Sequence, residues 1–250
     1  MSDAAAPVEA PELSIVVPVF EEGEAVDPVM RALTAAIATP HEILVVYDFD
    51  EDPTVPVIER LHTELPAIRG LHNDLGPGVL NAMKAGIAAS RGTWVLISMA
   101  DGSDDPDVVD PMVALARAGA DVVSASRYMR GGRQIGGPPL KRLMSRTAGL
   151  TLHWFGGIAT HDPTNNFKLY SHRLLDATPI ESEAGFELAL ELTVKATLTG
   201  RRVAEVPTTW RDRTVGRSNF KLRKWLPHYL RWYSVAMRGR LSGSTQRRRT

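Results

Sequence analysis

The sequence predicts an α/β fold in which helices flank a mostly parallel central sheet. Short runs of apolar and β-branched residues recur along its first half, which is typical of strands buried on both faces. Segments of helical character separate these runs, as expected for βαβ units. Several runs end in acidic residues, and the loops after parallel strands are where such folds bind ligands.

The predicted elements follow one another in a regular order. Strands are expected at residues 13–19 (LSIVVPV), 42–48 (EILVVYD), 67–73 (AIRGLHN), 93–99 (TWVLISM) and 120–126 (ADVVSAS). Helices are expected at residues 25–38, 54–64, 76–90 and 106–117. The third strand has the weakest pattern, and the helix at 76–90 begins with glycine and proline and carries small residues along its length.

Composition excludes several classes of protein. A chain of 250 residues buries about 75% of its unfolded surface, so it needs no disulfide or metal to fold. The absence of cysteine excludes thiol catalysis and cysteine-bound zinc. No apolar stretch approaches the roughly 18 residues of a transmembrane helix, and the acidic, proline-containing N-terminus is not a secretory signal. We therefore expect a soluble, cytoplasmic protein.

One domain is expected over residues 12–240, between a disordered segment at 1–11 and a basic tail at 241–250. Its two halves carry opposite charge, although the net charge is zero. Residues 1–120 contain 6 Lys and Arg against 20 Asp and Glu, whereas residues 121–250 contain 23 against 9. The halves could simply attract each other. The excess charge gathers in loops and in one C-terminal segment, which favours a division of binding tasks.

Carboxylates gather after three of the predicted strands. They are Glu21, Glu22 and Glu24 after the first strand, Asp48, Asp50 and Asp52 after the second, and Asp101 after the fourth. No Gly-x-Gly-x-x-Gly follows the first strand and no Gly-Lys-Ser/Thr occurs, so a dinucleotide fold or P-loop is not indicated. Acids beside a phosphate ligand require a bridging cation.

Seven segments in order resemble family 2 glycosyltransferases of the GT-A fold, and most closely their polyprenyl-phosphate branch, which includes dolichyl-phosphate mannosyltransferases. They are SIVVPVFEE, VVYDFDEDPT, LGPGVLNAMKAGIAASRGTWVLISMADGSDDP, SASRYMRGG, LKRLMSRTAG, DPTNNFKLYSHRLL and VAEVPTTWRDRTVGRSNF. The resemblance implies a GT-A (Rossmann-like) fold, with residues 12–120 binding a nucleotide sugar and 121–240 binding the acceptor. It also implies inverting transfer of a sugar from a nucleotide-diphosphate sugar to a polyprenyl phosphate.

The resemblance implies a set of nucleotide-binding residues. They are Pro18, Phe20, Glu22, Asp48, Asp52, Lys84 and Ala100. Uracil and guanine both remain open as the base, because a carboxylate can accept hydrogen bonds from either ring.

The family's metal-binding Asp-x-Asp is matched only in part, because its first acid is Met99 here. We expect Mg²⁺ or Mn²⁺ to bind Asp101 and Ser103, with diphosphate oxygens and water completing the shell. Asp105 is an alternative ligand, but for both Asp104 and Asp105 a helix N-cap is the favoured interpretation. The missing acid leaves open a non-catalytic nucleotide-sugar-binding protein.

Basic residues of the second half are the candidates for binding an acceptor phosphate. By resemblance, Arg127 and Arg213 join Asp101 as catalytic residues, and Arg142 and Ser145 bind the acceptor phosphate. A lipid phosphate is already ionised near neutral pH, so it needs no general base. The alternative for each arginine is a solvated surface charge.

A saccharide hydroxyl acceptor would instead need a carboxylate base, and Glu187 and Glu191 are the candidates. Their spacing equally fits an ordinary amphipathic helix. His153 and His161 lack metal-ligand spacing and are expected to be structural.

Two segments indicate contact with a membrane surface. Residues 220–240 mix tryptophan and tyrosine with cations, as interfacial helices do, although packing of these aromatic residues onto the domain is the alternative. Residues 142–159 combine cations with apolar residues and could line a lipid entry groove. We expect peripheral attachment at the cytoplasmic membrane face and no nucleic-acid binding. Whether a separate membrane protein anchors the chain is left open.

Overall fold

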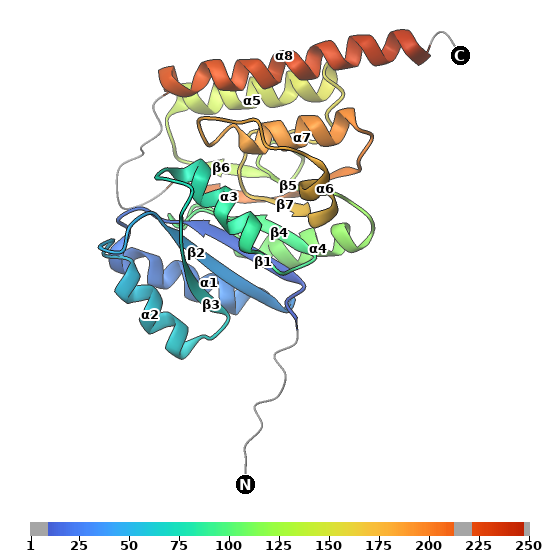
Figure 1. Cartoon of the computed structure of the whole chain (residues 1–250). Helices are drawn as coiled ribbons and strands as arrows, with labels where there is room; N and C mark the ends of the chain where they lie inside the picture. The colour runs from blue at the N-terminus through green and yellow to red at the C-terminus, as the bar shows by residue number, and fades with distance from the viewer. Residues whose placement is uncertain (1–9, 213–221, 248–250) are drawn as a thin grey trace.

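A seven-stranded sheet lies at the centre of the computed structural model, which describes residues 10–212 and 222–247 (Figure 1). Its strands, from one edge to the other, are β3 (Ile68–His72), β2 (His41–Tyr47), β1 (Leu13–Pro18), β4 (Trp94–Ile97), β7 (Lys168–Ser171), β5 (Val122–Ser126) and β8 (Val203–Pro207). All neighbours are parallel except β7, which runs antiparallel to both β4 and β5. The five predicted strands are confirmed, whereas β7 and β8 were not predicted.

Both faces of the sheet are buried, which explains the unbroken apolar runs of its central strands. Ile15 and Val17 of β1 pack into one apolar cluster, and Val16 between them packs into the other. Glycine is required behind Val16, because a Cβ on Gly86 would lie 2.2 Å from a Val16 methyl carbon. The helix that carries Gly86 therefore approaches β1 closely at this point.

Helices cover the two faces unequally. One face carries η1 (Gly23–Ala25), α1 (Val26–Ala36), α2 (Val55–Glu64), η2 (Pro106–Val108) and α4 (Val109–Arg117). The other carries α3 (Val79–Ala89), α6 (His172–Ala177) and α7 (Leu188–Leu198). The helices predicted at 25–38, 54–64, 76–90 and 106–117 are therefore confirmed, with shorter bounds.

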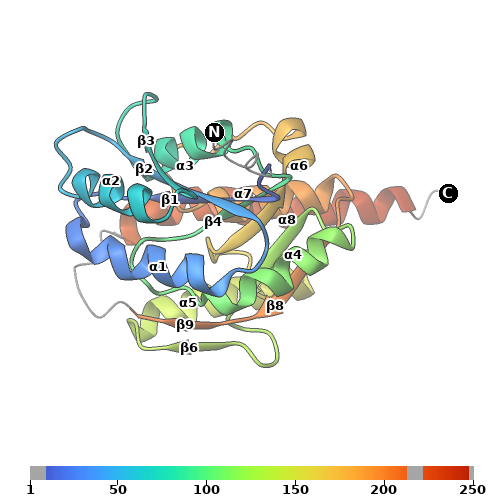
Figure 2. The same ribbon diagram turned by 90° about the horizontal axis from the view of Figure 1, so that it is seen from below.

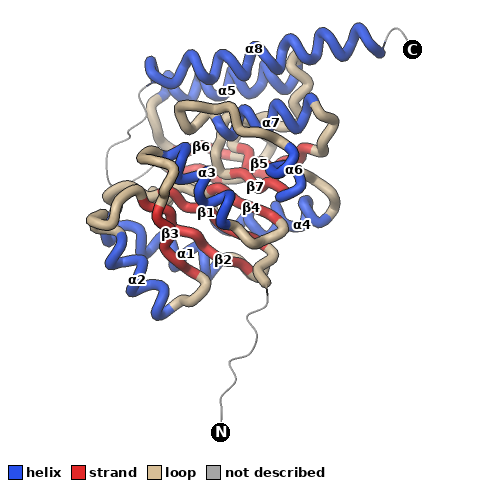
Figure 3. Tube along the Cα trace, viewed as in Figure 1, coloured by secondary structure: helices blue, strands red, loops and turns tan. Residues whose placement is uncertain are grey.

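Two long helices form a further layer over α7. Figure 3 shows α5 (Pro139–Trp154) and α8 (Leu222–Arg247) side by side above it. Leu152 of α5, Leu190 of α7 and Trp232 of α8 meet in a third apolar cluster. Most of the predicted lipid-groove segment 142–159 is thus a regular helix. α8 continues to Arg247, so residues 241–247 of the predicted basic tail are helical.

A small parallel sheet borders the loop that follows β4. It consists of β6 (Arg133–Ile135) and β9 (Thr209–Arg211), which lie beside α5 (Figure 2). The backbone N–H of Arg211 donates to the carbonyl of Ser103 at 3.0 Å, which ties β9 to that loop. Among the described residues, no helix is long and apolar enough to cross a membrane.

Candidate active site

A cavity of about 910 Å³ lies where the carboxyl ends of β1, β2, β4 and β5 face α5 and α8. Asp48, Asp101 and Asp104 line it after β2 and β4, Arg127 lines it directly after β5, and Arg142 lines it from α5. Aromatic and aliphatic side chains complete the lining, among them Met144, Phe186, Leu190, Trp225, Leu226 and Tyr229. The acidic and the basic parts of the sequence therefore meet in one cavity.

Five of the seven predicted nucleotide-binding residues line this cavity. They are Pro18, Phe20, Glu22, Asp48 and Ala100. The Asp48 carboxylate is held in place because Oδ1 accepts from Asn73 Nδ2 at 2.8 Å and Oδ2 accepts from the backbone N–H of Gly78, also at 2.8 Å. Phe20 is 52% exposed and meets Phe49 edge to face. An exposed aromatic ring at a cavity mouth is suited to stacking against a planar base.

Asp52 and Lys84 do not line the cavity, so direct nucleotide contact from them stays a prediction that this geometry does not favour. Asp52 is buried, and its carboxylate accepts from the backbone N–H groups of Glu21 at 2.9 Å and Thr54 at 2.8 Å. It thereby holds the turn in which Glu21 has a φ of +55°. Lys84 lies two positions after Ala82 on α3, which places it on the opposite side of the helix from the cavity.

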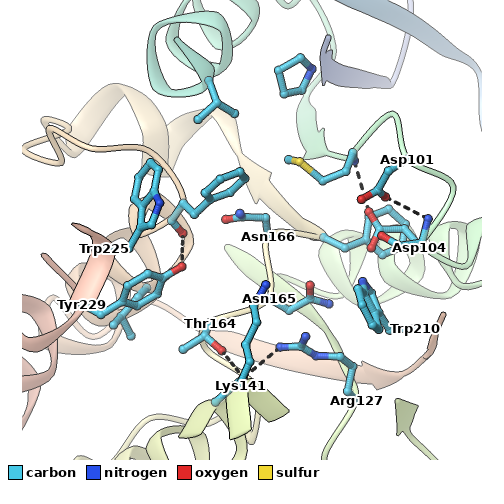
Figure 4. A pocket seen from close by; sticks show the side chains of 18 of the residues that line it. Asp101, Asp104, Arg127, Lys141, Thr164, Asn165, Asn166, Trp210, Trp225 and Tyr229 are labelled. Carbon is cyan, nitrogen blue, oxygen red and sulfur yellow. Dashed lines mark hydrogen bonds between the residues drawn. The ribbon is translucent and has the colours of Figure 1, made fainter. Parts of the chain in front are cut away.

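The loop after β4 presents two carboxylates to the cavity, Asp101 and Asp104 (Figure 4). Asp101 Oδ1 accepts from the backbone N–H of Ser103 at 3.0 Å, and Asp104 Oδ2 accepts from that of Met99 at 3.3 Å. Burial and the adjacent Asp101 carboxylate raise the pKa of Asp104 to about 7. Carboxylate oxygens are the ligands that a hard divalent cation prefers, so this loop has the chemistry of a cation ligand.

The N-cap prediction is right for Asp105 and wrong for Asp104. Asp105 accepts from the backbone N–H of Asp107 at 3.2 Å and so caps η2. Ser103 is 3% exposed, yet it lines the cavity beside Asp101. Among the described residues, no group of three or more His, Cys, Asp or Glu side chains could hold a metal ion by itself. A cation here would need ligands from the substrate as well, as Mg²⁺ commonly does.

Arg127 is anchored by a carboxylate that the sequence did not single out, Asp162. Their side chains are only 11% and 0% exposed, and Nε donates to Oδ2 at 2.7 Å while NH2 donates to Oδ1 at 2.9 Å. Burial disfavours the charged form of both side chains, but the charge on each side chain stabilises the opposite charge on the other. The pKa of Arg127 lies above its usual value and the pKa of Asp162 lies below its usual value. The pair aims one planar guanidinium at the cavity.

Ser145 completes this arrangement on α5. Its Oγ accepts from Arg127 NH2 at 3.3 Å and from the Tyr128 hydroxyl at 2.9 Å, and it shares a hydrogen bond with the Thr164 hydroxyl at 3.0 Å. Arg142 is exposed and lines the cavity one turn before Ser145. These contacts join α5 to residues 127–128 and to the loop at 162–166. That loop has the sequence DPTNN, which begins one of the segments that resemble the family. Arg213 lies outside the described residues.

A buried lysine lies directly beneath that loop. Lys168 is fully buried on β7, and its ammonium donates to the carbonyl of Asp162 at 2.9 Å and also to the carbonyl of Asn165. Burial lowers the pKa of Lys168 to about 7, although Asp162 partly opposes this effect. Local sequence pattern does not single out Lys168, because only the antiparallel pairing of β7 places it under the loop.

The family model for glycosyl transferase family 2 matches residues 14–178. The chain belongs to this family. Polyprenol monophosphomannose synthase of Mycolicibacterium smegmatis is 29% identical over 228 residues, which cover 84% of this chain and 85% of the relative. Undecaprenyl-phosphate mannosyltransferase of Micrococcus luteus is 29% identical over 209 residues, which cover 81% of this chain and 85% of the relative. The predicted resemblance to the polyprenyl-phosphate branch is thus confirmed.

Solved structures confirm the fold class. Glucosyl-3-phosphoglycerate synthase from Mycobacterium tuberculosis, in a complex with Mn²⁺, uridine diphosphate and phosphoglyceric acid, superposes with a TM-score of 0.65 at 16% identity. The match covers 92% of this chain and 78% of that one. The central sheet and its flanking helices therefore have the GT-A arrangement.

Glu187 and Glu191 have structural roles in this family 2 member. Both are completely buried, and neither lines the cavity. Glu187 accepts from the backbone N–H groups of Ala184 at 2.8 Å and Gly185 at 2.7 Å. Glu191 accepts from that of Ser182 at 2.7 Å and pairs with Lys195. The candidate general bases for a hydroxyl acceptor are therefore wrong, because these carboxylates already hold the loop before α7.

The two tryptophans of α8 pack inward, as the alternative interpretation expected. Trp225 and Trp232 are 7% and 3% exposed, and the Tyr229 hydroxyl donates to the carbonyl of Phe186 at 3.0 Å. The prediction that these tryptophans face a membrane is wrong, because Trp232 packs against α7 in the third apolar cluster and Trp225 lines the cavity edge to face with Phe186. The large exposed apolar side chains of this layer lie mainly on and just after α5, at Leu140, Leu143, Trp154 and Phe155.

His153 and His161 both have partners within the protein. Their rings stack with centroids 3.9 Å apart, His153 Nδ1 lies 2.8 Å from the carbonyl of Ile158, and His161 Nδ1 lies 2.5 Å from Glu205 Oε1. These contacts attach the end of α5 to β8, in agreement with a structural role.

Proposed function

We propose that this chain transfers a sugar from a nucleotide-diphosphate sugar to a polyprenyl phosphate. One observation carries the proposal: a single cavity is lined by the carboxylates Asp101 and Asp104, by the arginines Arg127 and Arg142, and by apolar side chains of α5, α7 and α8. A donor diphosphate with its cation suits the carboxylates, and an anionic phosphate on an apolar chain suits the arginines and the apolar lining. The lipid-phosphate mannosyltransferases among its relatives support the same assignment.

The donor would bind along the ends of β1, β2 and β4. The nucleoside would contact Pro18, Phe20, Glu22, Asp48 and Ala100, which all line this part of the cavity. Mg²⁺ or Mn²⁺ would be held on the diphosphate side by Asp101, with Ser103 beside it. The carboxylate chemistry of this wall fits such a hard cation. When bound, the cation would act as a Lewis acid that stabilises the departing diphosphate.

The acceptor phosphate would bind between Arg127, Arg142 and Ser145. Transfer breaks the bond between C1 of the sugar and the diphosphate oxygen, and it forms a bond between C1 and an acceptor phosphate oxygen. An ionised phosphate attacks without losing a proton to the protein, so the structural roles of Glu187 and Glu191 are no obstacle. A single in-line displacement of this kind inverts the configuration at C1. Arg127, fixed by Asp162, orients the attacking anion.

The acceptor lipid would reach the cavity from a membrane surface against α5. Leu140, Leu143 and Trp154 are 62%, 63% and 64% exposed, and the cations Arg142 and Arg146 lie on the same helix. Exposed apolar side chains mixed with cations suit the interface of an anionic bilayer. We assign this contact to the cytoplasmic membrane face, where nucleotide sugars are available.

Vesicle flotation tests the membrane contact. Leu143→Glu should reduce binding of the full chain to anionic phospholipid vesicles at least about tenfold, since a charge is costly at the apolar face. Leu75→Glu is the matched control, because Leu75 is 57% exposed but lies in the loop after β3. Binding of the purified chain alone would show that no separate anchor protein is needed. Equal effects of the two variants would refute the role of α5.

The transfer itself is tested with radiolabelled donors. UDP-sugars and GDP-sugars are supplied in turn with Mn²⁺ and polyprenyl phosphate, and the label is expected in an organic-extractable, acid-labile lipid. Arg142→Ala should raise the KM for the lipid phosphate, because it removes a cation from the cavity wall. Label only in water-soluble oligosaccharide would favour a hydroxyl acceptor. Nucleotide binding without turnover would favour a non-catalytic binding protein.

A further inference from the structure

The loop after β4 lacks the first acid of the Asp-x-Asp motif, and Met99 cannot replace it chemically. A thioether is a soft, neutral ligand, whereas Mg²⁺ and Mn²⁺ prefer oxygen ligands. Met99 is partly buried and packs against the apolar cluster on the α3 side of the sheet. The position therefore serves packing, and a cation at Asp101 would lack one carboxylate.

The loop folds back so that another carboxylate comes close to position 99. The hydrogen bond from Ser103 N–H to Asp101 Oδ1 closes a tight turn, and Gly102 has a φ of +67°, which favours glycine. The turn brings Asp104 Oδ2 to 3.3 Å from the backbone nitrogen of Met99. The carboxylate of Asp104 thus lies beside the backbone of the residue that lost its acid.

Asp104 is better placed for this task than the two acids that follow it. Asp101 and Asp104 both line the cavity, and Figure 4 shows them side by side. Asp105 caps η2, Asp107 is exposed, and neither lines the cavity. The backbone bond from Arg211 to Ser103 at 3.0 Å holds the loop in this conformation.

We propose that Asp104 supplies the carboxylate that Met99 has removed, so that Asp101 and Asp104 together hold the divalent cation of the donor. The proposal rests on the transfer function proposed above. In this chain the carboxylate that replaces the first acid of the motif comes from position 104, five residues after position 99. Asp104 is then a metal-binding residue of this chain. For that reason the site can bind its cation with Met99 in place of the first aspartate of the motif.

Mn²⁺ binding to the full chain tests the proposal without any measurement of turnover. Free Mn²⁺ is measured by electron paramagnetic resonance in the presence of UDP and, separately, GDP. Asp104→Asn should weaken Mn²⁺ binding at least about tenfold, since loss of even an indirect metal contact commonly costs 10- to 100-fold. Asparagine can still accept from the Met99 N–H, so the loop conformation is retained.

Asp105→Asn is the matched control, because it removes the same charge one residue away and should change the affinity less than about twofold. Adding Met99→Asp to Asp104→Asn should restore Mn²⁺ binding to within about threefold of the unaltered chain, since a carboxylate returns to the site. Circular dichroism confirms that each variant is folded.

The outcomes separate this proposal from the transfer function. Equal affinities for the Asp104→Asn and Asp105→Asn chains, with a loss only in Asp101→Asn, would overturn the role of Asp104 and leave the transfer function standing. Failure of the double variant to regain binding would also count against it, because the missing carboxylate would then not be the cause. No Mn²⁺ binding by the unaltered chain with either nucleotide would reject the metal site as a whole.

Discussion

Asp162→Asn should destabilise the protein far more than the loss of a surface ion pair. Asp162 is completely buried and accepts from Arg127 three times, from the backbone N–H at 3.0 Å, from Nε at 2.7 Å and from NH2 at 2.9 Å. An amide has a single acceptor oxygen, and its NH2 group faces a guanidinium that stays charged. Breaking a buried pair in this way typically costs about 3–5 kcal/mol of unfolding free energy.

Urea unfolding followed by tryptophan fluorescence measures this cost. The control is Glu12→Gln, which removes the ion pair of Glu12 with Arg117, whose side chains are 28% and 52% exposed. That change should cost less than about 1 kcal/mol, because solvent screens exposed pairs. Transfer to polyprenyl phosphate should also fall in the folded fraction of Asp162→Asn, since Arg127 loses its orientation. A cost below about 1 kcal/mol would refute the claim that a buried charge pair fixes Arg127.

Three further changes test other parts of the structure. Lys168 has a folded pKa of about 7, below the unfolded value near 10.5, so between these values the unfolded chain binds more protons and stability rises with pH. From pH 7 to pH 9 the unfolding free energy should therefore rise by about 2–3 kcal/mol more in the unaltered chain than in Lys168→Met. Unfolding free energies that change with pH in the same way in both chains would contradict this. Gly149→Ala would place a Cβ 2.3 Å from the carbonyl oxygen of His161, so it should cost about 1–3 kcal/mol in thermal unfolding, whereas Thr147→Ala on the exposed side of α5 should change little. Glu187→Gln should lower stability by about 1–3 kcal/mol while kcat of the folded enzyme stays within about twofold, and a selective loss of kcat would instead restore its candidacy as a general base.

The overall α/β class and the acidic edge of the sheet could be read from local sequence. Buried strands such as β1 and β2 have unbroken apolar runs, because each presents side chains to a cluster on both faces. Chain direction in βαβ units then requires that the residues after these strands share one edge. Asp48 and Asp101 were expected at this edge for this reason, Arg127 was expected at the site by resemblance, and all three line the cavity.

Local pattern could not decide how each polar side chain is used. Asp104 and Asp105 are adjacent and chemically identical, yet one lines the cavity and the other caps η2. Asp48 and Asp52 follow the same strand, but the second is buried against backbone N–H groups of the turn after β1. Which acid reaches a ligand depends on loop torsions and on neighbours that lie about 30 residues away in the chain.

The sequence by itself determined five strands of the central sheet, the charge of its active edge and membership of a glycosyltransferase family. Only the tertiary structure decided that Asp162 holds Arg127, that Lys168 lies beneath their loop, and that the tryptophans of α8 face inward. The physical reason is the separation along the chain over which each effect acts. Apolar periodicity and turn preference act over a few neighbouring residues. A buried ion pair or an antiparallel β7 depends instead on contacts between distant segments, whose free energy appears only when the chain closes on itself.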